Sequence, residues 1–324
     1  MLVVSDLSAV PSEARGASVA LGNFDGVHRG HAVVIGAAAE AARRLGAPLA
    51  ALTFEPHPRE LFRPDDPPFR LTLAEAKRDA LASLGVEVLV SVPFDLAFSR
   101  IAAEDFVRDI LAGRLGARHV ACGPNFHFGH RRGGTPALLA ALGAELGLGV
   151  TVVEKAAGEG GLPLSSTAIR HALAEGDVAR ANAILGRPWE IRGVVERGAA
   201  LGRTLGFPTA NVKLGRHLTP RLGVYAVRAG VADGAGGVAW FDGAASLGVR
   251  PTVNPLPEPL LEVFLFDFSG ELYGRTLRVA FEGFLREEAK FDSLDALVAQ
   301  MRADCEAARA VLARDERPFM SAPS

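Results

Sequence analysis

Short apolar runs alternate with amphipathic stretches over the first 186 residues of this chain of 324 residues. The apolar runs predict strands, which we expect at residues 17–21, 48–54, 86–92, 119–122 and 150–153. Apolar positions at helical spacing predict the helices between them, at residues 31–45, 73–84, 103–115 and 137–146. This alternation is typical of a parallel, doubly wound, Rossmann-like α/β sheet, in which ligands bind beyond the carboxyl ends of the strands.

The pattern becomes β-rich after Pro188. Short apolar runs separated by turn residues predict closely spaced strands at residues 191–195, 223–229, 237–247, 260–268 and 276–285. Such spacing is typical of a small antiparallel β-barrel, and an amphipathic stretch at 294–314 predicts a C-terminal helix. We therefore expect two domains, residues 1–186 and residues 187–324.

The composition of the chain limits the classes of function that we expect for it. The chain is 49% hydrophobic and has a net charge of −2, so no basic field indicates a nucleic-acid partner. Cys122 and Cys305 are too few for a disulfide framework, which favours the reducing cytoplasm. We find no signal peptide and no apolar run long enough for a membrane span. The oligomeric state stays open.

The string GNFDGVHRGH, residues 22–31, joins the first predicted strand to its helix. His28 and His31 are three residues apart and therefore face one side of the helix start. Imidazoles at a helix N-terminus could hold the phosphates of ATP and stabilise a pyrophosphate leaving group. Gly30 leaves room for a phosphate to approach. For the histidine pair alone, a glycine-rich turn with two exposed histidines is the alternative.

Three further polar loops follow predicted strands or begin a helix. FEPHP, residues 54–58, holds His57 between two prolines, and GPNFHFG, residues 123–129, follows the fourth strand. SSTAIR, residues 165–170, offers hydroxyl groups at a helix start and Arg170 one turn later. Helix capping alone is the alternative for the hydroxyl groups, but four such loops together predict one phosphate-binding pocket.

The β-rich half carries its own dense motif at residues 198–211, GAALGRTLGFPTAN. Its glycines could bring backbone N–H groups close to phosphates. Thr209 and Asn211 alternate along an extended segment, so both face one side. A hydroxyl and an amide oxygen there could ligate Mg²⁺, which prefers hard oxygen ligands. A glycine-rich hairpin is the alternative.

These strings resemble the signature blocks of bacterial bifunctional riboflavin kinase/FMN adenylyltransferases, also called FAD synthetases. The blocks at 22–31, 54–58, 123–129 and 165–170 resemble the adenylyltransferase module, and the block at 206–211 resembles the riboflavin kinase module. The resemblance implies that the barrel phosphorylates riboflavin to FMN with ATP and Mg²⁺. It implies that the N-terminal module joins FMN to the adenylyl group of ATP, which releases pyrophosphate and gives FAD.

The resemblance also assigns roles to residues. Glu262 is implied as the catalytic base of the kinase, and His28 and His31 as the catalytic pair of adenylyl transfer. The residues expected to bind ATP are Gly22, Asn23, Phe24, Asp25, Gly30, His57, Asn125, Ser166, Thr167, Arg170, Gly198, Gly202, Arg203, Gly206 and Pro208. The flavin is expected to contact Phe62, Phe106 and Phe128, for each of which ordinary core packing is the alternative. Thr209 and Asn211 are the expected metal ligands.

One residue departs from the pattern of this family. Phe264 stands two residues after Glu262, where a histidine is common. The alternatives are therefore a single-activity FAD synthetase with a weakened kinase module, a nucleotidylyltransferase that acts on another phosphate, or a non-catalytic flavin-binding regulator. We prefer the interpretation as a bifunctional enzyme, for which the small molecules ATP, riboflavin and FMN are the expected partners.

Overall fold

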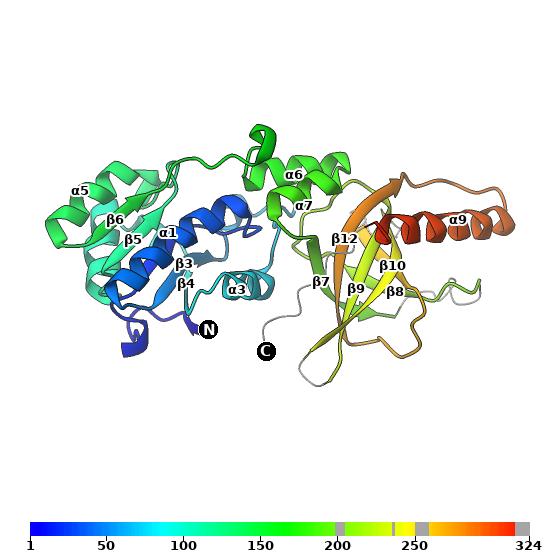
Figure 1. Ribbon diagram of the computed structural model, residues 1–324, viewed down its shortest axis with the longest axis horizontal. Helices are drawn as coiled ribbons and strands as arrows, with labels where there is room; N and C mark the ends of the chain where they lie inside the picture. Colours follow the sequence, from blue (N-terminus) through cyan, green and yellow to red (C-terminus); the bar gives the residue numbers. More distant parts are fainter. Residues whose placement is uncertain (198–204, 235–236, 250–258, 315–324) are drawn as a thin grey trace. The chain divides into compact units, whose positions relative to one another are not determined.

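The structure is a computed structural model that describes residues 1–197, 205–234, 237–249 and 259–314. The chain forms two compact units. The first unit comprises Met1–Pro67 and Ala74–Leu164, and the second comprises Pro68–Leu73 and Ser165–Ser324. Figure 1 shows the elements of both units, coloured along the sequence.

The first unit is built on a parallel sheet in the order β1-β4-β3-β2-β5-β6, which confirms the predicted Rossmann-like architecture. Its strands are β1 (Leu2–Val4), β2 (Ser18–Leu21), β3 (Leu49–Glu55), β4 (Val88–Pro93), β5 (His119–Cys122) and β6 (Gly149–Val152). The strand order reverses between β2 and β5, and ligands of such sheets bind at this switch point. The short edge strand β1 was missing from the prediction.

Helices cover both faces of this sheet. The helical segments of the first unit are η1 (Ser12–Ala14), α1 (Arg29–Leu45), α2 (Pro58–Phe62), α3 (Ala74–Ser83), η2 (Phe98–Arg100), α4 (Ala103–Asp105), η3 (Phe106–Arg114), η4 (His130–Arg132), α5 (Pro136–Leu146) and η5 (Glu159–Gly161). Successive strand residues point to opposite faces. Ala20 therefore packs with Ile35 of α1 and Leu81 of α3, whereas Leu21 packs with Phe106 of η3 and Leu139 of α5.

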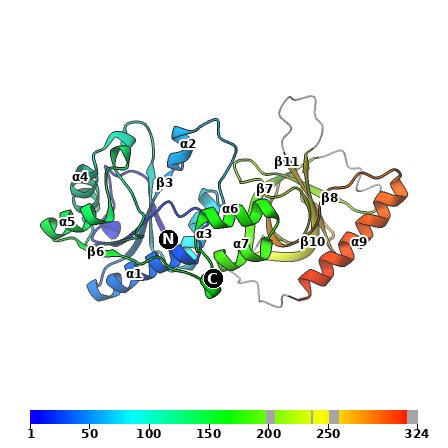
Figure 2. The ribbon, with the colours of Figure 1, turned by 90° about the horizontal axis from the view of Figure 1, so that it is seen from above.

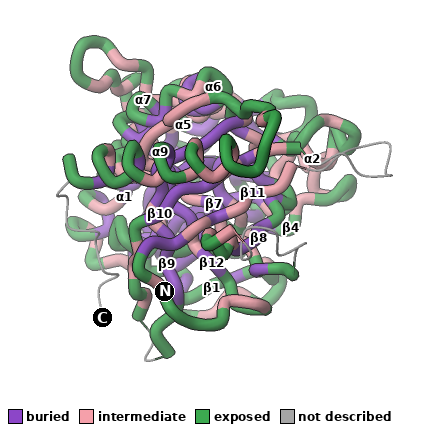
Figure 3. The backbone as a smooth tube through the Cα atoms, turned by 90° about the vertical axis from the view of Figure 1, so that its right-hand side faces the viewer, coloured by how far each residue is buried: buried purple, intermediate pink, exposed green. Residues whose placement is uncertain are grey.

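The second unit contains a closed antiparallel barrel in the order β10-β11-β8-β7-β12-β9, which confirms the predicted architecture. Its elements are α6 (Ser166–Glu175), α7 (Val178–Leu185), β7 (Trp189–Glu196), β8 (Thr209–Lys213), β9 (Gly223–Ala232), β10 (Val238–Val249), β11 (Pro259–Leu265), β12 (Thr276–Arg286) and α9 (Leu294–Leu312). The helix α9 packs against β9, β10 and β12 (Figures 1 and 2). The barrel strands are largely buried, whereas the outer side of α9 is exposed (Figure 3).

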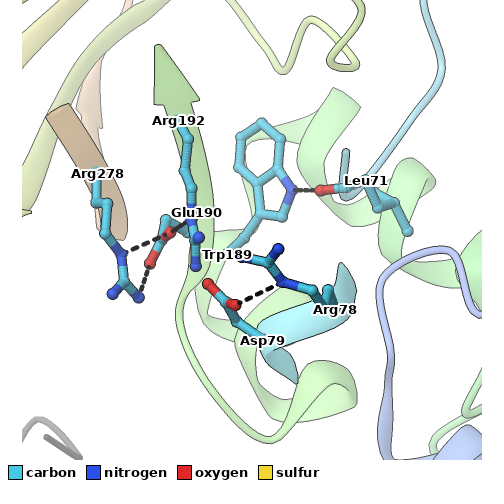
Figure 4. Close-up of polar contacts among 7 residues, drawn as sticks. All are labelled: Leu71, Arg78, Asp79, Trp189, Glu190, Arg192 and Arg278. Atoms are coloured by element: carbon cyan, nitrogen blue, oxygen red, sulfur yellow. Dashed lines mark hydrogen bonds and ion pairs between the residues drawn. The ribbon is translucent and has the colours of Figure 1, made fainter. Parts of the chain in front are cut away.

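The segment Pro68–Leu73 is part of the second unit although it comes from the first quarter of the chain. The indole N–H of Trp189 donates to the carbonyl oxygen of Leu71 at 2.9 Å (Figure 4). The backbone N–H of Leu218 donates to the carbonyl oxygen of Arg70 at 2.8 Å. The two compact units therefore divide after Leu164, and the second unit also includes Pro68–Leu73. The division by function at residue 186 stays a prediction.

Beside Trp189, Glu190 is held by two arginines of the barrel (Figure 4). Arg278 donates to both carboxylate oxygens at 3.0 and 2.8 Å, and Nε of Arg192 donates to one of them. Burial favours the protonated carboxyl, but the hydrogen bonds and charges of Arg278 and Arg192 outweigh it and lower the pKa of Glu190. These contacts join β7 to β12 on the outside of the barrel.

Candidate active sites

The loop between β2 and α1 places His28 and His31 at a helix N-terminus. His28 is the N-cap of α1, with extended backbone angles (φ −84°, ψ 172°). Nδ1 of His28 accepts from the backbone N–H of His31, and Nδ1 of His31 accepts from the backbone N–H of His28, both at 3.3 Å. The two rings stack with 3.6 Å between their centroids. The pair therefore caps the helix and lies where helix N–H groups favour an anion.

This capping determines which ring nitrogen carries the proton. A nitrogen that accepts a hydrogen bond has no hydrogen, so in a neutral ring the proton lies on Nε2. A protonated imidazole has a hydrogen on both nitrogens and could not accept through Nδ1. In their neutral form, His28 and His31 would therefore each be a donor through Nε2–H.

The loop before the histidines is buried and has an unusual backbone. Phe24 and Val27 have φ angles of 49° and 43°, in a region that residues with side chains rarely adopt. Phe24 is 0% exposed, and its ring meets the His31 ring edge-on at a centroid distance of 5.2 Å. Asp25 is also buried. The Phe24 side chain thus supports His31, and its predicted contact with ATP, which stays a prediction, would be through the backbone.

Close packing against other atoms of the protein requires glycine at position 30. A Cβ atom at Gly30 would lie 2.7 Å from the carbonyl oxygen of Leu164 and 3.0 Å from Cε1 of His28. At Gly22, a Cβ atom would lie 3.1 Å from the Phe24 ring. Close packing accounts for glycine at both positions, and the predicted phosphate contacts of Gly22, Asn23, Asp25 and Gly30 stay predictions.

Two further predicted loops follow β3 and β5, the neighbours of β2 in the sheet. His57 is the N-cap of α2, and its Nδ1 accepts from the backbone N–H of Arg59 at 3.1 Å. Its own backbone N–H donates to the Glu60 carboxylate at 3.0 Å. Asn125 is exposed in the loop after β5. Because the strands are parallel, these loops and the loop of His28 lie at one edge of the sheet.

The phenylalanines predicted to contact the flavin lie in different environments. Phe106 and Phe128 are buried, with 5.4 Å between their ring centroids, in the core of the first unit. Phe62 is 60% exposed on α2, and its ring meets that of Phe94 edge-on at 6.0 Å. The two buried rings match the alternative of core packing, whereas Phe62 has an open face for a planar ligand. Flavin contact stays a prediction for all three.

The hydroxyl-rich loop belongs to the second unit. Ser166 and Thr167 begin α6, whose N-cap is Ser165. Nε of Arg170 donates to the carbonyl oxygen of Phe69 at 2.9 Å, and its guanidinium lies over the Phe69 ring at 5.4 Å. Arg170 thus has partners within its own unit. That Ser166, Thr167 and Arg170 bind the same ATP as the histidines stays a prediction.

The outer face of the barrel carries two rows of aligned side chains. Glu262 of β11 pairs with Asn211 of β8 and with Ser246 of β10. Two positions along β11, Phe264 pairs with Thr209 of β8. Directly paired residues project to the same face of a sheet. Thr209 and Asn211 therefore share one face, as their spacing predicts, and Glu262 lies between the two neighbouring strands on that face.

These rows line a cavity of about 580 Å³, a volume that suits a small-molecule ligand. Asn211 is 6% exposed, and its Oδ1 atom is buried with no hydrogen-bond partner among the described residues. A buried acceptor without a donor is costly unless a ligand or an ion satisfies it. The oxygens of Thr209 and Asn211 beside the Glu262 carboxylate form a hard donor set, which fits Mg²⁺.

Phe264 is part of an aromatic wall. Its ring meets the ring of Phe207 at a centroid distance of 5.3 Å and the ring of Phe266 at 5.7 Å. Phe207 and Phe264 both line the cavity. The departure from the family pattern therefore places an apolar ring next to Glu262.

The glycine-rich motif is described only in part. Gly198, Gly202 and Arg203 lie outside the described residues, and their predicted ATP contacts stay predictions. Gly206 has a φ of 85°, a conformation that favours glycine. Pro208 directly precedes β8. ATP binding by Gly206 and Pro208 also stays a prediction.

An ion pair that the sequence analysis missed connects two walls of the cavity. Nε and one terminal nitrogen of Arg286 donate to the two carboxylate oxygens of Asp304, each at 2.7 Å. Gln300 donates to the same carboxylate at 3.0 Å, and Arg286 and Asp304 both line the cavity. The sequence contains one signal of this pair. Asp304 is a charged residue on the same helix face as Met301 and Ala308, where an apolar residue is expected.

Known proteins resemble both halves of the chain. A family model for FAD synthetase matches residues 10–168, and one for riboflavin kinase matches residues 185–312. The bifunctional riboflavin kinase/FMN adenylyltransferase of Escherichia coli (strain K12) is 41% identical over 302 residues, which cover 93% of this chain and 94% of the relative. The protein of the same description from Pseudomonas fluorescens is 42% identical over 313 residues, with coverages of 97% and 98%.

The fold is also similar to a solved structure. A protein described as a macrolide-efflux protein from Streptococcus pneumoniae superposes with a TM-score of 0.83 and 31% identity, over 95% of this chain and 98% of the other. In the described part of this chain, no helix is both long and apolar enough to cross a membrane.

Proposed function

The chain belongs to the family of bifunctional riboflavin kinase/FMN adenylyltransferases, and we propose how its residues carry out the two reactions. It phosphorylates riboflavin to FMN and adenylylates FMN to FAD, with ATP as the donor in each step. The two family models in succession along one chain carry this conclusion. An FAD synthetase with a weakened kinase, or a non-catalytic flavin-binding regulator, is not favoured.

In adenylyl transfer, we propose that His28 and His31 bind the phosphates of ATP through Nε2–H. A phosphate oxygen of FMN attacks the α-phosphorus, the bond from the α-phosphorus to the bridging oxygen breaks, and pyrophosphate leaves. Neutral donors placed beforehand at the N-terminus of α1 stabilise the charge that grows on the leaving group. The reciprocal caps support this role because they direct both Nε2–H groups away from the helix backbone.

In the kinase reaction, we propose that Glu262 is the catalytic base. Its carboxylate takes the proton of the ribityl 5′-hydroxyl while that oxygen attacks the γ-phosphorus of ATP, and ADP leaves. The position of Glu262 in the wall of the cavity, directly paired with Asn211, supports this role. Phe207 and Phe264 would shield the reacting oxygen from water.

We propose Thr209 and Asn211 as the ligands of Mg²⁺. The ion would neutralise charge on the phosphates of ATP in the kinase site. The buried Oδ1 atom of Asn211, which has no partner among the described residues, supports this assignment.

We also propose the cytoplasm as the compartment. Cys122 and Cys305 are both free, and free thiols without disulfides are typical of proteins in a reducing compartment.

Product analysis separates the two sites. The protein is incubated with ATP and Mg²⁺ and either riboflavin or FMN, and FMN and FAD are separated by chromatography. His28→Ala should convert riboflavin to FMN and form no FAD, whereas Glu262→Gln should form FAD only from added FMN. His171→Ala and Glu271→Gln alter exposed residues of the same types and serve as controls. Full kinase turnover in Glu262→Gln would refute the proposed base.

A further inference from the structure

Lys77 places a charged side chain inside the first unit. It lies on α3 and is 1% exposed, although lysine is almost never fully buried unless it is paired. Its Nζ atom lies 3.3 Å from Oγ1 of Thr53 and 3.4 Å from a carboxylate oxygen of Glu55. Thr53 and Glu55 both lie in the last three residues of β3, which is the neighbour of β2. The ammonium group therefore lies at the edge of the sheet from which the loop of the histidines leaves.

Thr53 connects Lys77 to that loop. Its hydroxyl donates to the carbonyl oxygen of Asn23 at 3.0 Å. A hydroxyl has one proton, and an ammonium group has donors only. Because Lys77 donates to Oγ1 of Thr53, the threonine proton must be directed to another acceptor, which is Asn23. The lysine thus fixes the direction of the hydrogen bond that holds the loop.

The Asn23 carbonyl group, which accepts from Thr53, lies directly before Phe24, whose ring contacts His31. Asn23 is followed by Phe24, whose φ of 49° leaves its backbone little freedom. The Phe24 ring is buried and meets the His31 ring edge-on. A shift of the Asn23 carbonyl would therefore pass to Phe24 and then to the imidazole of His31.

We propose that Lys77 is a positioning residue for adenylyl transfer. Through Thr53 and the Asn23 carbonyl, it holds the loop in the conformation that presents the two stacked histidines to ATP. The inference rests on the proposed role of the histidines and adds a residue that the reaction needs although it does not touch the substrate. The expected consequence is a change in ATP binding that is confined to one of the two activities.

The test uses Lys77→Met and Thr53→Val in the full chain, with FMN and ATP as substrates. Each variant should raise the KM for ATP in FAD formation about tenfold, the loss expected for a hydrogen bond to a charged group. The double variant should be no worse than the worse single variant, because both remove one connection. Thr53→Ser keeps the hydroxyl and should restore the KM, and Lys155→Met removes an exposed lysine of the same unit as a control.

The riboflavin kinase activity of each variant reports on the rest of the protein and should stay unchanged. A purely structural role would lower the amount of active enzyme, so the apparent kcat would fall with the KM for ATP unchanged. That result, or additive effects in the double variant, would overturn the proposal. Thr53→Val introduces no unpaired charge and keeps the test valid if Lys77→Met does not fold. The role of the histidines is tested separately by FAD formation in His28→Ala.

Discussion

The ion pair between Arg286 and Asp304 should determine both the stability of the second unit and its affinity for riboflavin. The informative change is Asp304→Asn, because it keeps the size of the side chain and one acceptor oxygen but removes the charge. The carboxylate joins the end of β12 to α9 through two hydrogen bonds of 2.7 Å. Since both residues line the cavity, the change loosens the connection between two of its walls.

The exposure of the pair determines the magnitude. The side chains of Asp304 and Arg286 are 9% and 25% exposed, so the pair is neither on the open surface nor fully buried. Breaking a fully buried pair costs about 3–5 kcal/mol, whereas an exposed pair contributes less than about 1 kcal/mol. We expect Asp304→Asn to lower the free energy of unfolding by about 2 kcal/mol. For a unit of this size, that corresponds to a decrease in Tm of about 6 °C.

Thermal unfolding and riboflavin kinase kinetics form the assay. Asp267→Asn is the matched control, because Asp267 is 81% exposed and lies 3.2 Å from Arg309 of α9. Asp304→Asn should lower the Tm and raise the KM for riboflavin, while FAD formation from added FMN stays unchanged. If Asp304→Asn and Asp267→Asn have the same Tm and the same KM, the pair does not hold the cavity and the reasoning is refuted.

Two further predictions concern histidines of the first unit. Burial lowers the pKa of His119, so as pH falls from about 7 to about 5 the unfolded chain takes up a proton before the folded one, and stability falls. The free energy of unfolding of the wild type, measured by urea denaturation, should therefore fall relative to that of His119→Gln over this range; a constant difference would contradict the assignment. His28→Asn should be about 1 kcal/mol more stable than His28→Ala because asparagine caps helices well, yet form no FAD. Retained FAD formation in His28→Asn would show that Nε2–H is not needed.

The fold was largely predictable because its signals are local. Buried parallel strands are continuous apolar runs, and the predicted strand at residues 119–122 coincides with β5. The pattern missed β1, which is only three residues long, and β8, which is hidden in the glycine-rich motif. It also missed α7, and it could not show that the helix predicted at residues 103–115 continues as the π-helical η3, since that depends on packing.

The sequence could not predict that Pro68–Leu73 belongs to the second unit. The sequence predicts these residues as the end of a loop between the strand at 48–54 and the helix at 73–84. Their partner Trp189 is 118 residues away from Leu71 along the chain, and a backbone carbonyl leaves no trace in the amino-acid pattern. Long-range partners of backbone atoms can be found only in a structure.

Candidate residues were easiest to predict where they follow strands of known direction. The spacing of His28 and His31 predicted that their rings lie together, and they stack. The spacing did not predict that each ring accepts from the other's backbone, because capping depends on side-chain rotamers. Glu262 was predicted only through the family resemblance, because a single glutamate in a strand has no distinct pattern. Its pairing with Asn211 depends on the register of β8 and β11.

The two sites relate chemistry to stability in opposite ways. At the proposed adenylyl-transfer site, the Nδ1 atoms of His28 and His31 cap the helix through backbone N–H groups, so folding favours the same residues as the proposed chemistry. In the kinase site, Oδ1 of Asn211 is buried without a partner among the described residues, which costs about 1–3 kcal/mol. An apolar residue of similar shape would stabilise the barrel more. Packing among the described residues therefore does not explain this amide, whereas the proposed binding of Mg²⁺ to its oxygen would.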